Sequence, residues 1–182
     1  FGAYNVLTQR NSKILNSGFV HARHNYKFGG AIHSFLFYQL QFNEILLLNK
    51  REVMGTGVKW NLLSKDSLRL SLGTGGMYEQ EFLNVQKITA NDSAETRFYR
   101  GAIFGSFVWK AKSYLTLSNV VYYQPRFVDF SDYRLLNDLT LNVKINKLIS
   151  LVTAISYRYD SRSPESLTDY DLNVGFGLEF KY

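Results

Sequence analysis

The chain ends in LTDYDLNVGFGLEFKY, residues Leu167–Tyr182, a stretch that alternates with a period of two. Bulky apolar and aromatic residues occupy the even positions from Tyr170 to Tyr182, and charged or small residues occupy the odd positions from Asp169 to Lys181. Successive side chains of a strand point to opposite faces, so this pattern predicts one strand with an apolar face and a polar face. The segment is longer than a usual strand of a soluble sheet, and such a strand is typical of a membrane barrel wall, with lipid outside and a polar interior.

The same alternation recurs along the whole chain. We expect further strands at Gly2–Gln9, Ser17–Phe28, Ala31–Phe42, Arg51–Leu62, Ser67–Gln80, Arg97–Lys110, Tyr114–Gln124, Arg134–Leu148 and Ser150–Asp160. The sequence therefore predicts an all-β fold, an antiparallel up-and-down transmembrane β-barrel of about ten strands, as one domain over residues 1–182. A hairpin preceding Phe1 would raise the count to about twelve. The chain opens inside an ordered pattern without a signal peptide, so we expect a mature chain or a fragment of one.

The composition excludes several other classes of protein. No apolar run approaches the roughly 18 residues that a spanning helix needs. The chain has no cysteine, so disulfides and thiolate metal sites are excluded. The net charge is +6, but the basic residues are scattered singly and accompany no recognition motif, which argues against nucleic-acid binding.

The connections between these segments alternate in length. Short ones are predicted at Gly29–Gly30, Ser64–Asp66, Ala111–Ser113 and Lys147–Ile149. Long ones are predicted at Arg10–Asn16, Asn43–Lys50, Phe82–Thr96, Pro125–Tyr133 and Ser161–Ser166. Bacterial outer-membrane barrels have short periplasmic turns and longer extracellular loops. We therefore expect the long loops to be extracellular and both termini to be periplasmic in a bacterial outer membrane.

Aromatic residues sort to the two ends of the predicted strands, as the girdles of a membrane protein do. The periplasmic girdle is predicted to contain Phe28, Trp60, Trp109, Phe180 and Tyr182. The extracellular girdle is predicted to contain Tyr78, Tyr99, Tyr123, Tyr159 and Tyr170. A soluble barrel with an apolar interior would show the same alternation. The long strands, the one-sided loops and the bulk of the apolar face favour the membrane.

Charged residues occupy the positions that this parity turns toward the interior. They are Arg23, Lys27, Arg51, Lys59, Arg69, Glu79, Arg134, Asp138, Lys144, Arg158, Asp160, Asp169, Asp171, Glu179 and Lys181. They could line a transport path, or they could form ion pairs that fill a narrow barrel. Barrels of about eight strands are filled by side chains, whereas open channels need about sixteen, so we expect a filled interior.

Catalytic and metal chemistry find little support in the sequence. A lipid hydrolase would need a base beside its nucleophile and a group to orient that base. His24 falls on the predicted outward face and Ser34 could lie diagonally from it, but the adjacent His33 and Ser34 point to opposite faces. His21 and His24 also take opposite faces, and the acids of Asp160–Asp169 lack the spacing of a calcium loop. We expect no metal, no cofactor and no enzymatic activity, with a lipid-modifying enzyme as the least favoured alternative.

Several stretches resemble a family of salt-induced outer-membrane proteins, a domain family of unknown function (DUF481-like). They are FYQLQFNEILLLNKREVMGTGVKW at Phe37–Trp60, HARHNY at His21–Tyr26, GGMYEQE at Gly75–Glu81 and the tail from Ser156 to Tyr182. The resemblance implies an outer-membrane barrel and assigns no reaction. The tail also looks like the signal that barrel-assembly machinery reads on a final strand, here Gly175, Phe176, Leu178, Phe180 and Tyr182.

The function expected from these observations is that of a structural or interaction barrel, an accessory subunit of a larger outer-membrane complex. A narrow channel for small solutes or ions is the alternative. The expected partners are outer-membrane lipid and lipopolysaccharide, the assembly machinery during insertion, and other outer-membrane proteins. The loop Phe82–Thr96 is the best-placed element for binding such a partner, because long barrel loops often carry this role.

Overall fold

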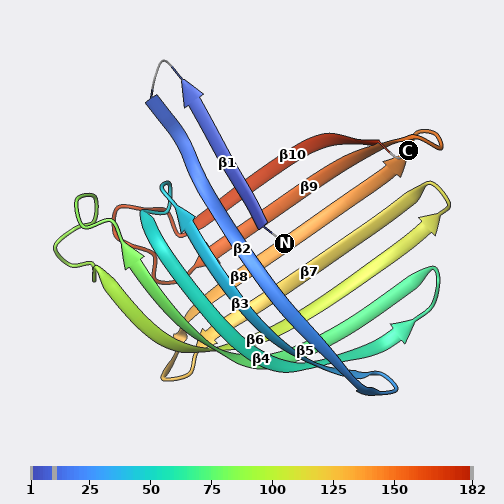
Figure 1. The fold of residues 1–182 in the computed structure, drawn as a ribbon, viewed down its shortest axis with the longest axis horizontal. Helices are drawn as coiled ribbons and strands as arrows, with labels where there is room; N and C mark the ends of the chain where they lie inside the picture. The colour runs from blue at the N-terminus through green and yellow to red at the C-terminus, as the bar shows by residue number, and fades with distance from the viewer. Residues whose placement is uncertain (1, 10–11, 181–182) are drawn as a thin grey trace.

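The computed structural model describes residues 2–9 and 12–180, which form ten antiparallel strands (Figure 1). The strands are β1 (Gly2–Gln9), β2 (Ser12–Gly29), β3 (Ile32–Asn43), β4 (Leu48–Ser64), β5 (Leu68–Leu83), β6 (Glu95–Lys112), β7 (Leu115–Arg126), β8 (Asp129–Lys144), β9 (Ile149–Asp160) and β10 (Tyr170–Phe180). The all-β, up-and-down fold predicted from the alternation is confirmed. The described part contains no helix able to cross a membrane.

All ten strands belong to one sheet in sequence order, and each strand pairs with its neighbours along the chain. Figure 1 shows this sheet coiling into an incomplete barrel. Within the described residues β1 pairs only with β2 and β10 only with β9, so the wall is not closed. This differs from the expected closed barrel, because closure requires a ladder between β1 and β10. The edge strand β10 is almost fully exposed along its length.

The two ends of the sheet differ in their connections. The turns at 30–31, 65–67, 113–114 and 145–148 lie at one end, which we call the turn end. The connections at 44–47, 84–94, 127–128 and 161–169 lie at the other, the loop end. With ten antiparallel strands, Gly2 and Phe180 lie at the turn end.

Some predicted boundaries are wrong. The loop predicted at Pro125–Tyr133 is only the turn at 127–128, because β7 and β8 continue through these residues and pair Pro125 with Tyr133. The prediction treated Pro125 as a loop residue. Proline can also lie within a strand, at a position where the ladder on one side has a gap and needs no N–H donor. The β6–β7 ladder has such a gap opposite Pro125, at Gly101 and Ala102.

Other strands are also displaced from their predicted ends. β8 ends at Lys144 rather than at Leu148, and β2 begins at Ser12 rather than at Ser17. The predicted loop Arg10–Asn16 is therefore mostly strand, and its residues 10 and 11 lie outside the described residues. Polar residues are tolerated at strand ends, so composition alone marks these boundaries poorly.

The register places apolar side chains on an exposed outer face. Leu36, Ile103 and Leu178 are exposed, and Phe176 has an exposed fraction of 77%. A soluble monomer rarely exposes such a continuous apolar surface. The opposite, inner face carries the buried residues. Some of them are polar or charged, and Val53, Met77 and Ala102 form a small apolar core that packs against Phe37.

Glycines make room for aromatic rings on the inner face. The rings of Phe35 and Phe104 meet with their centroids 5.8 Å apart. Gly73 faces Phe104 across the β5–β6 ladder, and a Cβ atom at Gly73 would lie 2.2 Å from that ring. The absence of a side chain at this position therefore makes room for the interior aromatic layer.

Candidate functional site

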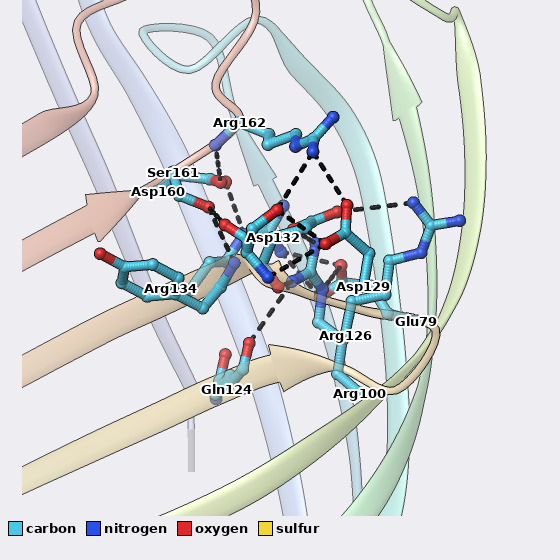
Figure 2. Close-up of polar contacts among 12 residues, drawn as sticks. Glu79, Arg100, Gln124, Arg126, Asp129, Asp132, Arg134, Asp160, Ser161 and Arg162 are labelled. Atoms are coloured by element: carbon cyan, nitrogen blue, oxygen red, sulfur yellow. Dashed lines mark hydrogen bonds and ion pairs between the residues drawn. The ribbon is translucent and has the colours of Figure 1, made fainter.

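Glu79 is the centre of a buried charged cluster at the loop end of the inner face (Figure 2). Its side chain, on β5, has an exposed fraction of 0%. Arg51 of β4 pairs with it, Arg100 of β6 donates from Nε to Oε1 at 3.2 Å, and Arg134 of β8 donates from Nη1 to Oε1 at 2.8 Å. One carboxylate thus receives three guanidinium groups from three strands.

Three further carboxylates form ion pairs with these arginines. Glu81 lies 3.1 Å from Arg51 Nε and 3.0 Å from Arg134 Nη2. Asp160 accepts from Arg134 Nε at 2.5 Å, and Asp132 lies 2.8 Å from Arg100 Nη2. Together with Arg126, which lies 3.6 Å from Asp132, these residues form what we call the loop-end ion cluster. Its members are Arg51, Arg100, Arg126, Arg134, Glu79, Glu81, Asp132 and Asp160.

The charges of the loop-end ion cluster balance, with four arginines against four carboxylates. Balance matters because an unpaired charge is costly to bury, whereas a fully paired and hydrogen-bonded group of charges is tolerated. Removing one member would leave an uncompensated charge in a site where Arg100 has an exposed fraction of only 1%. The cluster is therefore a structural unit whose members depend on one another.

The cluster crosses the interior rather than following the wall. Neighbouring strands lie about 4.8 Å apart, so β5 and β8 are separated by about 14 Å along the sheet. Glu79 and Arg134 nevertheless contact directly. The sheet must curve enough here for side chains to meet across its hollow. At this level the inner space is occupied by ion pairs.

The predicted interior network is only partly assembled into this cluster. Of the predicted interior charges, the members of the cluster are Arg51, Glu79, Arg134 and Asp160. Asp138 forms a separate pair with Arg158 at 3.2 Å and accepts from Ser156 at 2.5 Å. The network is therefore divided into a large buried cluster and smaller, more exposed contacts.

The remaining predicted network residues lie elsewhere. Asp169 accepts from Ser163, Asp171 from Asn173 and Glu179 from Asn142, at distances of 2.6, 2.7 and 2.9 Å. Among the described residues, Arg69 and Lys144 take part in no salt bridge. Lys181 lies outside the described residues.

Sequence reasoning missed four interior charges of the cluster, namely Glu81, Arg100, Arg126 and Asp132. Glu81 shares the parity of Glu79, and Arg100 shares that of Ala102 on the same strand, so parity alone could have placed both. On β6 the apolar residues Phe104 and Val108 share the parity of Arg100, which made its polar face harder to recognise. Asp132 was assigned to a loop that the structure shows to be strand.

The predicted girdle residues that belong to the described part of the chain lie on the apolar outer face. At the turn end Trp60, Trp109, Phe28 and Phe180 are exposed. At the loop end the ring of Tyr78 packs against that of Tyr99, with centroids 5.2 Å apart, and Tyr133 lies between Tyr123 and Tyr159 at 5.6 and 5.7 Å. Tyr170 is also exposed. Of the predicted assembly signal, Gly175, Phe176, Leu178 and Phe180 lie on β10, and Tyr182 falls outside the described residues.

Two long loops contact each other beyond the loop end. Glu165 accepts from Thr89 Oγ1 at 3.1 Å and from Asn91 Nδ2 at 3.0 Å, and its N–H donates to Asp92 at 3.2 Å. The backbone N–H of Thr89 lowers the pKa of Asp92, and the N–H of Glu165 and the Thr89 hydroxyl act in the same direction. We call this contact between residues 84–94 and 161–169 the loop clasp.

The histidines do not assemble a catalytic group. His24 faces Leu36 on β3, and Ser34 faces Tyr26 on β2. The outward acid Glu52 binds Lys50 at 2.9 Å and Tyr38 at 3.1 Å. Among the described residues no three His, Cys, Asp or Glu side chains are grouped to hold a metal ion.

Comparison with known proteins agrees with the family expected from the sequence. The family described as "Protein of unknown function, DUF481" matches residues 2–182. No curated protein matches the chain. Among solved structures, a porin refined at 1.8 Å resolution is similar at 16% identity and a TM-score of 0.44. That match covers 96% of this chain and 54% of the porin chain, so this chain spans about half of its length. The chain belongs to the DUF481 family of proteins of unknown function.

Proposed function

We propose that this chain is an outer-membrane β-barrel protein of structural or interaction type, with its interior blocked by the loop-end ion cluster. In this proposal it serves as an accessory subunit of a larger outer-membrane assembly. The loop end faces the exterior of the cell and both described ends face the periplasm, as the unequal connections favour.

The exposed apolar face supports the membrane location. Phe176, Leu178 and Ile103 would each be unfavourable in water and favourable in hydrocarbon. The aromatic residues at the two ends of the strands suit the two headgroup levels of a bilayer.

The contact between Glu79 and Arg134 carries the proposal of a blocked interior. These groups approach to 2.8 Å across the hollow of the sheet, with Arg51 and Arg100 on either side. A conducting path would have to pass through a buried, charge-balanced cluster whose opening costs several ion pairs. A small-solute channel is therefore less well supported.

Planar-bilayer recording of the purified protein tests this part of the proposal. We expect no steady conductance steps from the wild type, and leak currents from Arg134→Ala, which removes the group that reaches across the interior. Lys87→Ala, in the exposed loop at 84–94, is the matched loss of one positive charge and should stay silent. Steady, ion-selective steps from the wild type would establish the channel instead.

The interaction role is tested by extraction in a mild detergent followed by identification of what co-purifies. We expect one outer-membrane protein in fixed ratio, retained by the wild type and reduced by Glu165→Ala, which disrupts the loop clasp. Asp66→Ala, in a turn at the opposite end, is the control and should keep the partner. A chain that extracts alone under all mild conditions contradicts this role.

We further propose that the barrel has no lipid-hydrolase activity. The proposal is supported by the register, which sets apolar Leu36 opposite His24, and by the engagement of Glu52 with Lys50 and Tyr38. A phospholipase or deacylase activity that disappears in His24→Ala would overturn it.

A further inference from the structure

Among the described residues, the positive side chains at the loop end of the interior are paired with carboxylates, whereas four positive side chains toward the turn end are not. Arg23 and Lys27 of β2, Lys59 of β4 and Arg69 of β5 share the inner-face parity of Glu79. Within the described residues none of these four forms a salt bridge, whereas each arginine of the loop-end ion cluster does. The two halves of the interior therefore present different electrostatic environments.

Lys27 and Lys59 of this set lie in one cross-strand row, with His33 between them. Lys27 faces His33 of β3, His33 faces Lys59, and Lys59 faces Gly73. The row continues through Phe104 to Tyr122. Lys27 and Lys59 are thus two strand spacings apart, about 10 Å, and their like charges repel each other unless something neutralises them.

A hollow of about 370 Å³ lies over this row. Its lining includes Arg23, His33 and Lys59 on one side and Phe104 and Tyr122 on the other, and no carboxylate. Asp138 faces Val120, another lining residue, across the β7–β8 ladder. Its carboxylate is held by Ser156 and Arg158, so it does not neutralise the hollow.

Arg23 is held in place by contacts that involve no carboxylate. Its guanidinium lies over the ring of Phe35, 4.3 Å from the centroid, and its Nε donates to Asn25 at 3.0 Å. Stacking on an aromatic face orients the planar group, and the two terminal nitrogens remain as donors for a planar or tetrahedral oxyanion.

His33 is also oriented as a donor. Ser71 Oγ donates to Asn61 Oδ1 at 2.9 Å, which turns the amide nitrogen of Asn61 toward Nε2 of His33 at 3.0 Å. Nε2 therefore accepts, and the proton of the neutral ring is carried by Nδ1. The hollow thus combines an arginine, a lysine and an imidazole N–H.

We propose that this hollow binds a small soluble oxyanion, a phosphate or carboxylate group, between Arg23, His33 and Lys59. The anion neutralises the row of positive charge, and Phe104 and Tyr122 bound it on the far side. The lining of the hollow shares no residue with the loop-end ion cluster, so the proposal is independent of whether the barrel conducts.

The test is a calorimetric titration of the purified protein with inorganic phosphate in a non-ionic detergent, which keeps lipid phosphate away. We expect saturable binding that weakens as salt is raised. Lys59→Gln and Arg23→Gln should each weaken it about ten-fold, because each removes one charge-assisted hydrogen bond. Lys59→Arg keeps the charge and should retain binding. Lys87→Gln, in the loop at 84–94, is the matched control and should change nothing.

Acetate added at constant ionic strength should displace phosphate, whereas choline should not. The absence of saturable binding, or equal weakening by Lys87→Gln and Lys59→Gln, overturns the proposal. A second arm replaces phosphate by a short-chain phosphatidylglycerol. If only this lipid binds, the ligand is a headgroup from the membrane and the soluble-anion site is wrong.

Discussion

Glu79 on β5 and Arg134 on β8 form an ion pair of 2.8 Å although β6 and β7 lie between their strands. No isolated hairpin of this chain could make that contact, because it needs the curvature of four consecutive strands. The pair therefore forms only once the wall has coiled. Its strength depends on burial, since Glu79 has no exposed side-chain surface.

A double-mutant cycle should show this dependence. Glu79→Gln should lower the free energy of unfolding by about 3–5 kcal/mol, because it leaves buried guanidinium groups without their shared counter-charge. The losses in Glu79→Gln and Arg134→Gln should not add, because both variants remove the same ion pair. The cycle should therefore give a large stabilising coupling energy between the two side chains. Urea titration followed by the fluorescence of Trp60 and Trp109 provides the measurement.

The matched pair is Asp138 with Arg158, whose side chains are 47% and 42% exposed. The same cycle there should give a coupling below about 1 kcal/mol, since solvent screens the charges. Equal couplings for the two pairs would show that burial does not determine the strength of the Glu79 cluster.

The strands and their faces could be predicted because alternation is a local property. In β10, the polarity of each residue from Tyr170 to Phe180 determines its side of the sheet without knowledge of any partner. The boundaries of β7 and β8 could not be predicted in the same way. Pro125 and Asp132 are ordinary loop residues, and only the pairing of Pro125 with Tyr133 places them in strands.

Half of the loop-end ion cluster was predicted from the sequence, but its arrangement was not. Parity places Glu79, Arg134 and Asp160 on the inner face. Their contacts depend on register and curvature, which join residues 55 positions apart in the chain. The cross-strand row of Lys27, His33 and Lys59 likewise emerges only from the relative register of three strands.

Gly73 should be intolerant of a side chain. In Gly73→Ala the new Cβ would lie 2.2 Å from the Phe104 ring, so the ring must shift within a packed interior. We expect a loss of about 1–3 kcal/mol in urea titration. Gly177→Ala, whose Cβ would meet nothing within 4 Å, is the control and should be nearly neutral. Similar losses for both variants would count against the tight packing of Phe104.

The outer and inner faces of β6 should contact different solvents. The chain has no cysteine, so nitroxides can be attached to Ile103→Cys and Ser106→Cys without background. In lipid vesicles we expect the label at Ile103, on the outer face, to collide with dissolved oxygen. The label at Ser106, which lines the inner hollow, should collide with a polar nickel chelate. Reversed accessibilities would exclude a membrane barrel.

The loop clasp should open at low pH. The pKa of Asp92 is lowered by hydrogen bonds, so its contribution to the contact is complete at neutral pH. That contribution is lost as the pH falls through the lowered value, below the range of an ordinary aspartate. Spin labels at Ser93→Cys and Ser166→Cys should therefore give a narrow distance distribution near neutral pH and a broad one near pH 2.

Asp92→Asn separates this effect from general acid unfolding. The amide keeps one oxygen but loses the charge that Thr89 and the Glu165 N–H stabilise. We expect a broadened distribution already at neutral pH, with the strands intact by circular dichroism. Asp66→Asn, in a turn at the opposite end, should leave the distribution unchanged. A narrow distribution in Asp92→Asn at neutral pH would mean that Glu165, through Thr89 and Asn91, holds the two loops together without Asp92.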